Sequence, residues 1–528
     1  MGIYLNPGNE NFRSMLKAPI YVDKTMMLKT LNDFIDRDNK YICVSRPRRF
    51  GKTIASEMIA AYYSRGCDSH VLFEKLKISK AEGYEDKLNK YNVIKIDLNS
   101  EYQNTRNKDS LIASIENKVA QEMQKEYGEC GIALDDSLAN NIMRVYASTR
   151  DTFIILIDEY DVLVREQVPQ ALFDEFLSFL NGLFKSATLR PAISLAYLTG
   201  ILPIVRDKIQ SKLNNIEEYT ILDAKELTEF VGFTPEEVKS LCEEWGMDYE
   251  DCRRWYDGYC LNGYEIYNPE SVVKSMRDKK YSNYWGKTSS YRVISDRLEA
   301  NFDGMKDQVI RMLSGEKVPV NVTRYLNTMD SFNSRNDAFT YLIHVGYLAY
   351  DEEDQSCRIP NREIRQEWEN AMETQPGYEV TFRIIEASRE LLSATVKGDE
   401  DAVAKALDES HIHVTSNRSY NNEDALQSAI YLAYIYALNK YTVIKEMTTG
   451  RGFADVVFIP YVPDLPAMII ELKHNKCVES ALDQIKEKKY FDSLKDYKGG
   501  LLFVGVNYDE KDKTHECRIE SFTKSESE

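Results

Sequence analysis

Cysteine and histidine are scarce in this chain, and neither forms a pattern that holds a metal. Nine cysteines are dispersed through 528 residues without a C-x-x-C pair, so we expect reduced core thiols rather than disulfides or a zinc knuckle. The six histidines are also dispersed. His411 and His413 lie close together, but no cysteine or third histidine at ligand spacing accompanies them, and we interpret both as ordinary residues.

Long apolar runs and targeting segments are missing as well. No run reaches the roughly 18–20 residues that span a bilayer. The N-terminal segment MGIYLNPGNENF has neither a basic start nor an apolar signal region. Asn6 stands where N-myristoylation requires Ser or Thr. We therefore expect a cytoplasmic protein with no membrane partner.

Positive charge is also in deficit. The net charge of −18 argues against a protein that coats nucleic acid non-specifically, but it does not exclude a local basic groove. Positive clusters occur at residues 46–49, 362–365 and 486–489, and we interpret each first as a solvated face. At about 100–200 residues per domain, the length predicts roughly three domains.

A phosphate-binding loop is indicated between a strand and a helix near the N-terminus. The apolar run 41–45 suits a buried parallel strand, residues 46–53 read Arg-Pro-Arg-Arg-Phe-Gly-Lys-Thr, and residues 54–63 have a helical pattern. The N-terminus of such a helix offers free N–H groups and a partial positive charge to an anion. This order of elements is typical of an ATPase.

Within that loop, Lys52 is predicted to contact the β- and γ-phosphates of ATP, and Thr53 is predicted to coordinate Mg²⁺. The loop departs from G-x-x-x-x-G-K-[ST] at its first position, which is Arg46, and Pro47 removes one N–H from the phosphate cradle. The loop residues assigned to nucleotide binding are Arg46, Arg48, Arg49, Gly51, Lys52 and Thr53.

A second apolar run, residues 153–158, ends in two acids. Asp158 is predicted to hold Mg²⁺ directly or through water, and Glu159 is predicted to polarise the hydrolytic water. The alternative is a buried strand that ends in a solvated acidic turn. Two further sheet strands are expected at residues 93–97 and 193–198.

Thr199 follows the last of these strands. It could sense the γ-phosphate, because ligands bind at the carboxyl ends of parallel strands. Arg206 comes shortly after. It either contacts phosphate, in the same or a neighbouring subunit, or is a surface helix charge.

Two expected strands near the C-terminus carry the residue types of a metal-dependent nuclease. Asp455 falls in the run 453–459, whereas Glu471 and Lys473 fall two apart in the run 467–473 and therefore share one face. Two carboxylates can hold a hard divalent cation such as Mg²⁺, and a nearby ammonium can assist the attacking water or stabilise developing charge. The alternative is a set of exposed acids, with Lys473 pairing weakly on the surface.

The surrounding elements follow the order α-β-β-β-α-β. They are expected at residues 425–437, 441–447, 453–459, 467–473, 478–495 and 500–506. Tyr490 is predicted to position the second helix or contact DNA. Glu423 is either a helix-dipole partner, which we favour, or an outer metal ligand.

The middle of the chain is predicted to be mainly helical. Residues 225–300 are expected to form a small helical lid. Residues 301–370 mix helices with a strand-like aromatic run at 341–350, so a winged-helix-like unit is one possible structure for this region. Asn361 is expected to cap a helix. Residues 379–409 have the pattern of amphipathic helices.

Several motifs together resemble the bacterial AAA-ATPase-like family. They are residues 21–25 (YVDKT), 46–53, 157–161 (IDEYD), 199–200, 231–238, 255–259, 267–269 and 283–285. Family members also carry arginine at the position of Arg46. The C-terminal segment resembles the PD-(D/E)XK nuclease superfamily module that is often fused behind that ATPase, and similar fusions are suspected in defence against mobile DNA. This resemblance implies that Gln484, on the second helix of the segment, supports the site.

These observations predict an α/β protein. We expect a P-loop ATPase parallel sheet with a helical lid and a middle region, followed by a restriction-endonuclease-like α/β domain. The expected boundaries are 1–224 for the ATPase, 225–300 for the lid, 301–415 for the middle region and 416–528 for the nuclease-like domain.

The predicted function is an ATP-regulated, Mg²⁺-dependent nuclease that acts on nucleic acid, with DNA favoured over RNA. One alternative is an ATP-driven switch or scaffold whose nuclease-like domain binds without cleaving. Another is an ATPase that is inactive because of its unusual loop. A homo-oligomer is plausible, since ATPases of this type often complete their sites in trans.

Overall fold

The computed structural model describes most of the chain. The described residues are 2–204, 215–286, 293–294, 302–313, 315–323, 334–373, 379–414, 426–427, 430–431, 433–449, 452–461, 465–490, 494, 497 and 499–522. Within these ranges, no helix has the length and apolar character needed to cross a membrane. The chain divides into a first compact unit (1–289, 301–304 and 318–364) and a second (290–300, 305–317 and 365–528).

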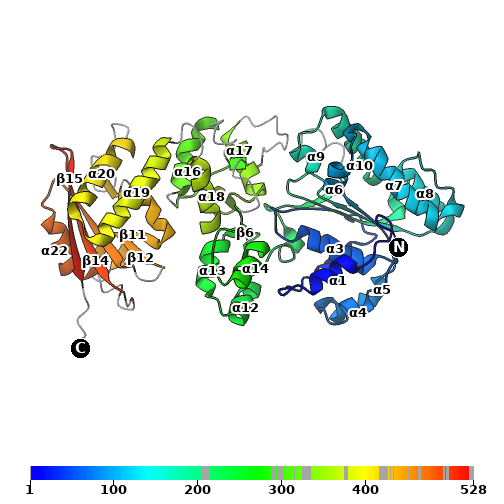
Figure 1. Cartoon of the computed structure of the whole chain (residues 1–528), viewed down its shortest axis with the longest axis horizontal. Coiled ribbons are helices and arrows are strands. Elements are labelled where there is room, and N and C mark those ends of the chain that lie inside the picture. The colour runs from blue at the N-terminus through cyan, green and yellow to red at the C-terminus, as the bar shows by residue number, and fades with distance from the viewer. Residues whose placement is uncertain are drawn as a thin grey trace. The chain divides into compact units, whose positions relative to one another are not determined.

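A five-stranded parallel sheet forms the centre of the first unit, in the order β2-β3-β4-β1-β5 (Figure 1). The strands are β1 Tyr41–Ser45, β2 Asn92–Asp97, β3 Phe153–Asp158, β4 Ile193–Gly200 and β5 Glu217–Tyr219. Strands β1, β3 and β4 are buried along their whole length, which explains their continuous apolar sequences. The four strands predicted for this region are confirmed, and β5 is an addition.

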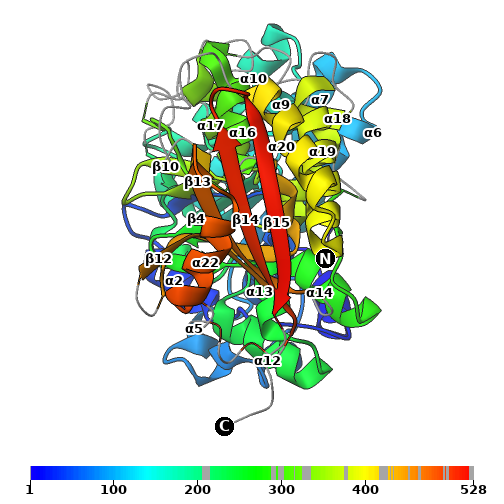
Figure 2. The same ribbon diagram turned by 90° about the vertical axis from the view of Figure 1, so that its left-hand side faces the viewer.

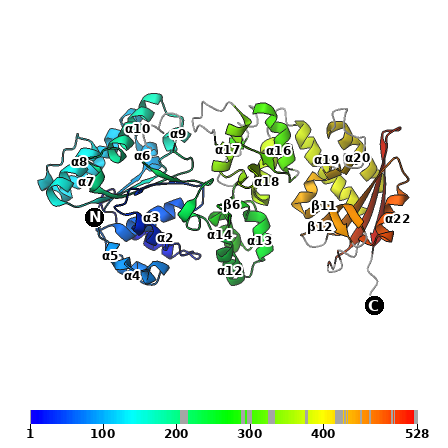
Figure 3. The same ribbon diagram turned by 180° about the vertical axis from the view of Figure 1, so that it is seen from behind.

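Helices cover both faces of this sheet. They are α1 Glu10–Leu16, α2 Met27–Phe34, α3 Lys52–Tyr63, α4 His70–Phe73, α5 Tyr84–Lys87, α6 Leu98–Asn104, α7 Leu111–Glu126, α8 Leu138–Thr149, α9 Val162–Arg165 and α10 Gln170–Phe184. Helices α1 and α3 lie on one face, and α7, α8 and α10 lie on the other (Figures 1 and 3). The apolar sides of α7, α8 and α10 share one hydrophobic core with the strands.

A small helical layer with its own core follows the sheet. It consists of α12 Pro235–Trp245, α13 Tyr249–Tyr256, the hairpin β6 Tyr259–Leu261 and β7 Tyr264–Ile266, and α14 Pro269–Asp278. A capping box starts α12, because the Thr234 hydroxyl accepts from the backbone N–H of Glu237 and the Glu237 carboxylate accepts from that of Thr234. The predicted helices are present, and the short hairpin between them was not predicted.

The remainder of the first unit corrects one prediction. Its elements are the three-stranded sheet β8 Val318–Pro319, β9 Ala349–Asp351 and β10 Ser356–Arg358, the helix α17 Arg335–His344, and the start of α18 Arg362–Glu373. The aromatic run at 341–350 was predicted as a strand, but α17 extends to His344 and only the short β9 follows. Burial on nearly all sides of α17 hides the helical period in its sequence. The predicted cap is confirmed: Asn361 Oδ1 accepts from the backbone N–H of Ile364 at 3.0 Å.

The second unit is built on a mixed five-stranded sheet in the order β11-β12-β13-β14-β15 (Figure 2). The strands are β11 Tyr441–Thr449, β12 Gly452–Pro460, β13 Ala467–His474, β14 Leu501–Asp509 and β15 Thr514–Phe522, and only β13 and β14 pair in parallel. The helices are α16 Met305–Leu313, α19 Glu379–Lys397, α20 Glu400–Val414 and α22 Glu479–Glu487. Helices α19 and α20 pack on one face of the sheet and α22 packs on the other.

Two predictions for this unit are wrong in extent. The helix predicted to run to residue 495 ends at Glu487, because Lys489 adopts a left-handed backbone conformation with φ 51°. The strand predicted at 500–506 was expected to be the last of the sheet, but β15 follows it. The alternating buried and exposed residues of β15 suit a sheet edge. Of the helix predicted at 425–437, the described residues 426–427, 430–431 and 433 are helical, and a short 3-10 helix, Ile435–Asn439, follows them. Glu423 and Arg206 lie outside the described residues.

Candidate functional sites

The phosphate loop connects β1 to α3 as the sequence predicted. Gly51 immediately precedes α3 with φ 89°, a left-handed conformation that suits glycine, and a Cβ there would meet no atom within 4 Å. The buried Lys52 ammonium donates to the carbonyl oxygens of Arg46 at 2.9 Å and Pro47 at 2.8 Å. Since an ammonium has three N–H donors, one remains for a phosphate oxygen. Burial lowers the pKa of Lys52 to about 8, against the opposing effect of nearby carboxylates.

Arg46, which stands where the loop motif has its first glycine, is directed toward β5. Its guanidinium is fully buried, and Nη1 donates to the carbonyl oxygens of Ser45 at 2.9 Å and Tyr219 at 2.8 Å. Burial lowers the pKa of Arg46 to about 10. Arg46 thus ties the end of β1 to β5, the neighbouring edge strand.

The acids at the end of β3 lie close to this loop. Asp158 is buried, accepts from the Thr199 hydroxyl and accepts from the backbone N–H of Glu159 at 3.0 Å. Burial raises the pKa of Asp158. Glu159 adopts φ 52°, a strained conformation for a residue with a side chain, at the turn out of the strand. Thr199 therefore supports the Asp158 carboxylate, and its predicted contact with phosphate stays a prediction.

Arg165 is a charged residue at this site that the sequence did not single out. Its Nη2 lies 2.7 Å from Glu159 Oε2, and its Nε lies 3.2 Å from Asp161 Oδ2. The Asp161 carboxylate also accepts from the backbone N–H groups of Ile201 and Leu202. The only signal was the i,i+4 spacing of Asp161 and Arg165, which is common on helix surfaces.

A cavity of about 750 Å³ opens beside the loop. Its polar wall includes Arg48, Arg49, Gly51, Lys52, Thr53, Asn99, Glu159 and Arg165. Its apolar wall includes Ile20, Val22, Phe230, Phe233 and Val273. A cavity with one ionic and one apolar wall suits a ligand with a charged chain and a flat ring. Of the predicted nucleotide-binding residues, all of them described, Arg46, Asp158 and Thr199 do not line it.

Arg48 and Arg49 differ within this wall. Arg48 is exposed, whereas the side chain of Arg49 is largely covered. Arg49 Nη1 donates to the carbonyl oxygens of Tyr284 at 3.0 Å and Trp285 at 3.1 Å, and its Nε lies 3.4 Å from Glu270 Oε2. The loop is therefore anchored to the segment that follows the helical layer.

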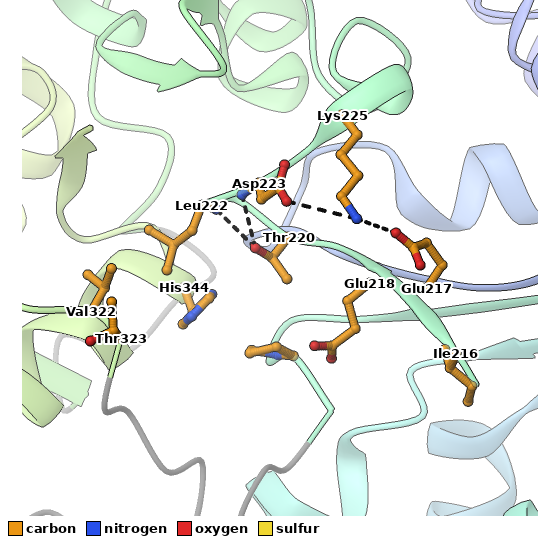
Figure 4. A pocket seen from close by; sticks show the side chains of 11 residues that line it. Ile216, Glu217, Glu218, Thr220, Leu222, Asp223, Lys225, Val322, Thr323 and His344 are labelled. Atoms are coloured by element: carbon orange, nitrogen blue, oxygen red, sulfur yellow. Dashed lines mark hydrogen bonds and ion pairs between the residues drawn. The ribbon is translucent and has the colours of Figure 1, made fainter. Parts of the chain in front are cut away.

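The first unit holds a separate cavity of about 420 Å³ around the end of β5 (Figure 4). There the Thr220 hydroxyl oxygen accepts from the backbone N–H groups of Leu222 and Asp223, at 3.1 and 3.2 Å. The Lys225 ammonium pairs with Glu217 and, at 3.9 Å, with Asp223 (Figure 4). These polar groups bond one another, and none belongs to the predicted nucleotide-binding set.

The second unit brings the predicted C-terminal residues together on the face of its sheet that carries α22. The Lys473 ammonium donates to Glu471 Oε1 at 3.0 Å and to Gln484 Oε1 at 2.9 Å. The Gln484 amide nitrogen donates to the same Glu471 oxygen and to the Tyr490 hydroxyl oxygen. Asp455 Oδ2, on β12, accepts from the backbone N–H of Leu472 at 2.7 Å. Two strands and one helix thus meet at these polar groups.

The Glu471 carboxylate has the character of a cation ligand. It is 2% exposed, and its Oε2 is buried with no hydrogen-bond partner among the described residues. Burial raises the pKa of Glu471 to about 7, and the negative charge of Asp455 contributes in the same direction. A cation bound between the two carboxylates would relieve both effects, so these residues fit a divalent ion.

The donor set nevertheless contains few side chains. In the described part of the chain, no three or more His, Cys, Asp or Glu side chains cluster closely enough to hold a metal ion. Asp455 and Glu471 therefore supply two carboxylates, and the remaining ligands of a hard cation would be water, backbone or substrate oxygens.

The comparisons with known proteins agree with this division. Residues 7–210 match the family described as Predicted AAA-ATPase, and residues 421–517 match the PD-(D/E)XK nuclease superfamily. A protein of Azotobacter chroococcum mcd 1, named "Uncharacterized protein in vnfD 5'region", is 22% identical over 514 residues, which cover 92% of each chain.

Two solved structures show weaker likeness. PCH-2 of C. elegans is 14% identical with a TM-score of 0.24, over 63% of this chain and 72% of that one. The ORC1 protein of Aeropyrum pernix, solved in complex with DNA, is 10% identical with a TM-score of 0.25, over 92% of this chain and 98% of that one.

Proposed function

We propose that this chain, which joins a predicted AAA-ATPase region to a domain of the PD-(D/E)XK nuclease superfamily, hydrolyses ATP and cleaves phosphodiester bonds with a divalent metal. The observation that carries the nuclease part is the meeting of Asp455, Glu471 and Lys473 on one face of the second sheet. The two carboxylates hold Mg²⁺, and the ion supplies charge stabilisation at the phosphate and a more acidic water. Lys473 donates toward the attacking water or the developing negative charge, and Gln484 orients both Lys473 and Glu471.

The ATPase part rests on the cavity beside the phosphate loop. Lys52, Arg48 and Arg49 bind the phosphates, and the apolar wall receives the base. Thr53 and Asp158 hold the Mg²⁺ that accompanies the nucleotide, and Glu159 polarises the hydrolytic water. The ATP state then regulates the access of nucleic acid to the second site.

The substrate is nucleic acid, with DNA favoured. Because the whole chain carries a net charge of −18, binding depends on local positive charge. Lys488 supports this view: its charge lowers the pKa of Glu471, so an ammonium sits near the site. We further propose a cytoplasmic protein that acts against mobile DNA and works as a homo-oligomer.

Substitution of the C-terminal site tests the proposal directly. Asp455→Ala and Lys473→Ala should each lower Mg²⁺-dependent DNA cleavage by at least about 1,000-fold, because each removes charge needed in the transition state. ATP turnover should stay at the wild-type rate. Asp512→Ala and Lys511→Ala, in the exposed turn between β14 and β15, are matched controls. Equal cleavage by wild type and both site variants would refute the nuclease.

One observation favours a different function for the second unit, in which it binds without cleaving. The described residues offer only two carboxylates at the site, which is few for a dedicated metal centre. A titration with Mg²⁺ and Mn²⁺ against a panel of fluorescent DNAs separates the two functions. Metal uptake with product supports the nuclease, whereas DNA binding with neither metal uptake nor product supports an ATP-driven switch or scaffold.

A further inference from the structure

Arg49 is held by the backbone of a segment more than two hundred residues away in sequence. Its Nη1 donates to two successive carbonyl oxygens, those of Tyr284 and Trp285, and its guanidinium carbon lies 5.7 Å from the centre of the Trp285 ring. Its Nε lies 3.4 Å from Glu270 Oε2, so a carboxylate also holds the guanidinium. Arg49 also lines the cavity beside the phosphate loop.

The same two residues are held from their other side by one buried carboxylate. Glu363 Oε1 accepts from the backbone N–H of Tyr284 at 2.7 Å and from that of Trp285 at 2.9 Å. It also accepts from the Ser271 hydroxyl at 3.0 Å. Carbonyl oxygens on one side and N–H groups on the other therefore connect Arg49 to Glu363 through a single short stretch of backbone.

Both Arg49 and Glu363 adopt energetically unfavourable states in this connection. Arg49 adopts φ 71°, a left-handed conformation that costs a non-glycine residue of order 1–3 kcal/mol. Glu363 is 1% exposed, and its burial raises the pKa of the carboxyl group to about 7. Such strain and burial persist where the surrounding contacts over-determine them, and they concentrate at functional sites.

Neighbouring contacts hold the loop in the same place. A Cβ on Gly346, which has φ 89°, would come within 2.8 Å of Pro47 and 3.0 Å of Trp285. The Tyr259 hydroxyl donates to the Gly346 carbonyl oxygen at 2.7 Å, and the Tyr259 ring packs edge-on against Phe50. Pro47 and Phe50 flank the two cavity arginines in the loop, so the position of Arg49 is set by residues outside the ATPase sheet.

We propose that Glu363 is a positioning residue of the nucleotide cavity: it fixes the Tyr284–Trp285 backbone, which in turn holds the Arg49 guanidinium toward the phosphates. This rests on the proposed ATP binding and deepens it. The planar guanidinium matches phosphate oxygens in direction, so a small rotation of Arg49 weakens the contact. Glu363 itself touches neither the nucleotide nor the reacting atoms.

Steady-state ATP hydrolysis by single and double variants tests this chain of contacts. Glu363→Ala should raise KM for ATP about tenfold while kcat stays within about twofold, the signature of lost binding that does not depend on the chemical step. Arg49→Ala should raise KM by a similar factor. Because Glu363 acts through Arg49, the double variant should be no worse than Arg49→Ala, which a double-mutant cycle measures. Glu363→Gln keeps a carbonyl acceptor for the two N–H groups and should restore most of the affinity.

Glu367→Ala is the matched control, because Glu367 is the other buried glutamate of α18. It should lower the urea midpoint of unfolding as Glu363→Ala does, and it should leave KM unchanged. If the KM of the double variant rises by the product of the two single-variant factors, Glu363 and Arg49 act independently and the proposal is refuted. An unchanged KM in a folded Glu363→Ala protein would also refute it. If Glu363→Ala does not fold, the cycle is run under the same criteria with Glu363→Asp, whose shorter side chain withdraws the carboxylate from the two N–H groups, and with Arg49→Lys. Failure of the wild type to bind ATP would instead refute the proposed ATPase.

Discussion

The two candidate sites both place a buried lysine near carboxylates, but they connect the charges differently. In the first unit, Lys52 donates to loop carbonyl oxygens, whereas Asp158 is satisfied separately by Thr199 and a backbone N–H. In the second unit, Lys473 donates directly to Glu471, two residues away on the same strand. The loop site keeps its cation and its acid on different elements, and the strand site pairs them.

This difference shows which ligand each site suits. The loop site surrounds a cavity with N–H and guanidinium donors, an arrangement that stabilises an anion. The strand site neutralises its lysine internally and leaves the buried Glu471 Oε2 as an acceptor, an arrangement that stabilises a cation. Both arrangements fit the proposed phosphate chemistry, one through the phosphate oxygens and the other through a metal.

Removal of the loop lysine should affect the first site and leave the second site unchanged. Lys52→Ala should lower ATP hydrolysis by at least about 100-fold, because the loop loses the ammonium that we propose contacts the β- and γ-phosphates. Phosphate release measures this effect. Calorimetric binding of Mn²⁺ to the second site should be unchanged. Lys29→Ala, an exposed lysine of α2, is the control, and loss of Mn²⁺ binding in Lys52→Ala would break the comparison.

A second prediction uses the buried acid that supports the loop site. Burial raises the pKa of Glu363 from 4.5 to about 7, so the folded state binds this proton more tightly than the unfolded state does. The resulting stability is fully present below pH 4.5 and is lost as the pH rises through 7. Between pH 4.5 and pH 8, the wild type should therefore lose about 3 kcal/mol more unfolding free energy than Glu363→Gln. Urea unfolding at several pH values measures the difference, and parallel pH profiles would contradict it.

The smallest expected effect concerns Gln484, which orients the charged residues of the strand site. Gln484 bonds both Glu471 and Lys473, so Gln484→Ala leaves the charges in place but loosens their orientation. Cleavage and Mn²⁺ affinity should each fall about tenfold, as for other residues that orient metal ligands. Asp483→Ala, the exposed neighbour on α22, should change neither. A loss as large as that of Asp455→Ala would mean that Gln484 acts on the substrate itself.

Much of the sheet structure follows from local sequence. The buried strands β1, β3 and β4 are continuous apolar runs, and the position of Lys52 at the start of α3 follows from the glycine and the helical pattern beside it. The shared face of Glu471 and Lys473 follows from the two-residue period of a strand. In each case the signal lies within a few residues of the side chain that it places.

The roles of two buried charges depend on distant partners that the sequence did not reveal. Arg46 was grouped with the nucleotide ligands, but its guanidinium bonds the carbonyl oxygen of Tyr219 on β5. Glu363 was not singled out, because its role depends on Tyr284 and Trp285, far back in the chain. No local pattern reports such pairings, since an arginine or glutamate has the same sequence signature whether it is solvated or buried.

The sequence by itself determined the types of most elements, the strand–loop–helix at which we propose that phosphate binds, and the carboxylates and amine of the second site, because residue type and spacing act over short range. The tertiary structure alone decided which charges are buried against which partners: Arg46 against β5, Arg165 against Glu159, and Glu363 against the backbone that holds Arg49. The physical reason is desolvation. A charge removed from water is stable only where the folded chain supplies its partners, and those partners come together only when distant segments pack.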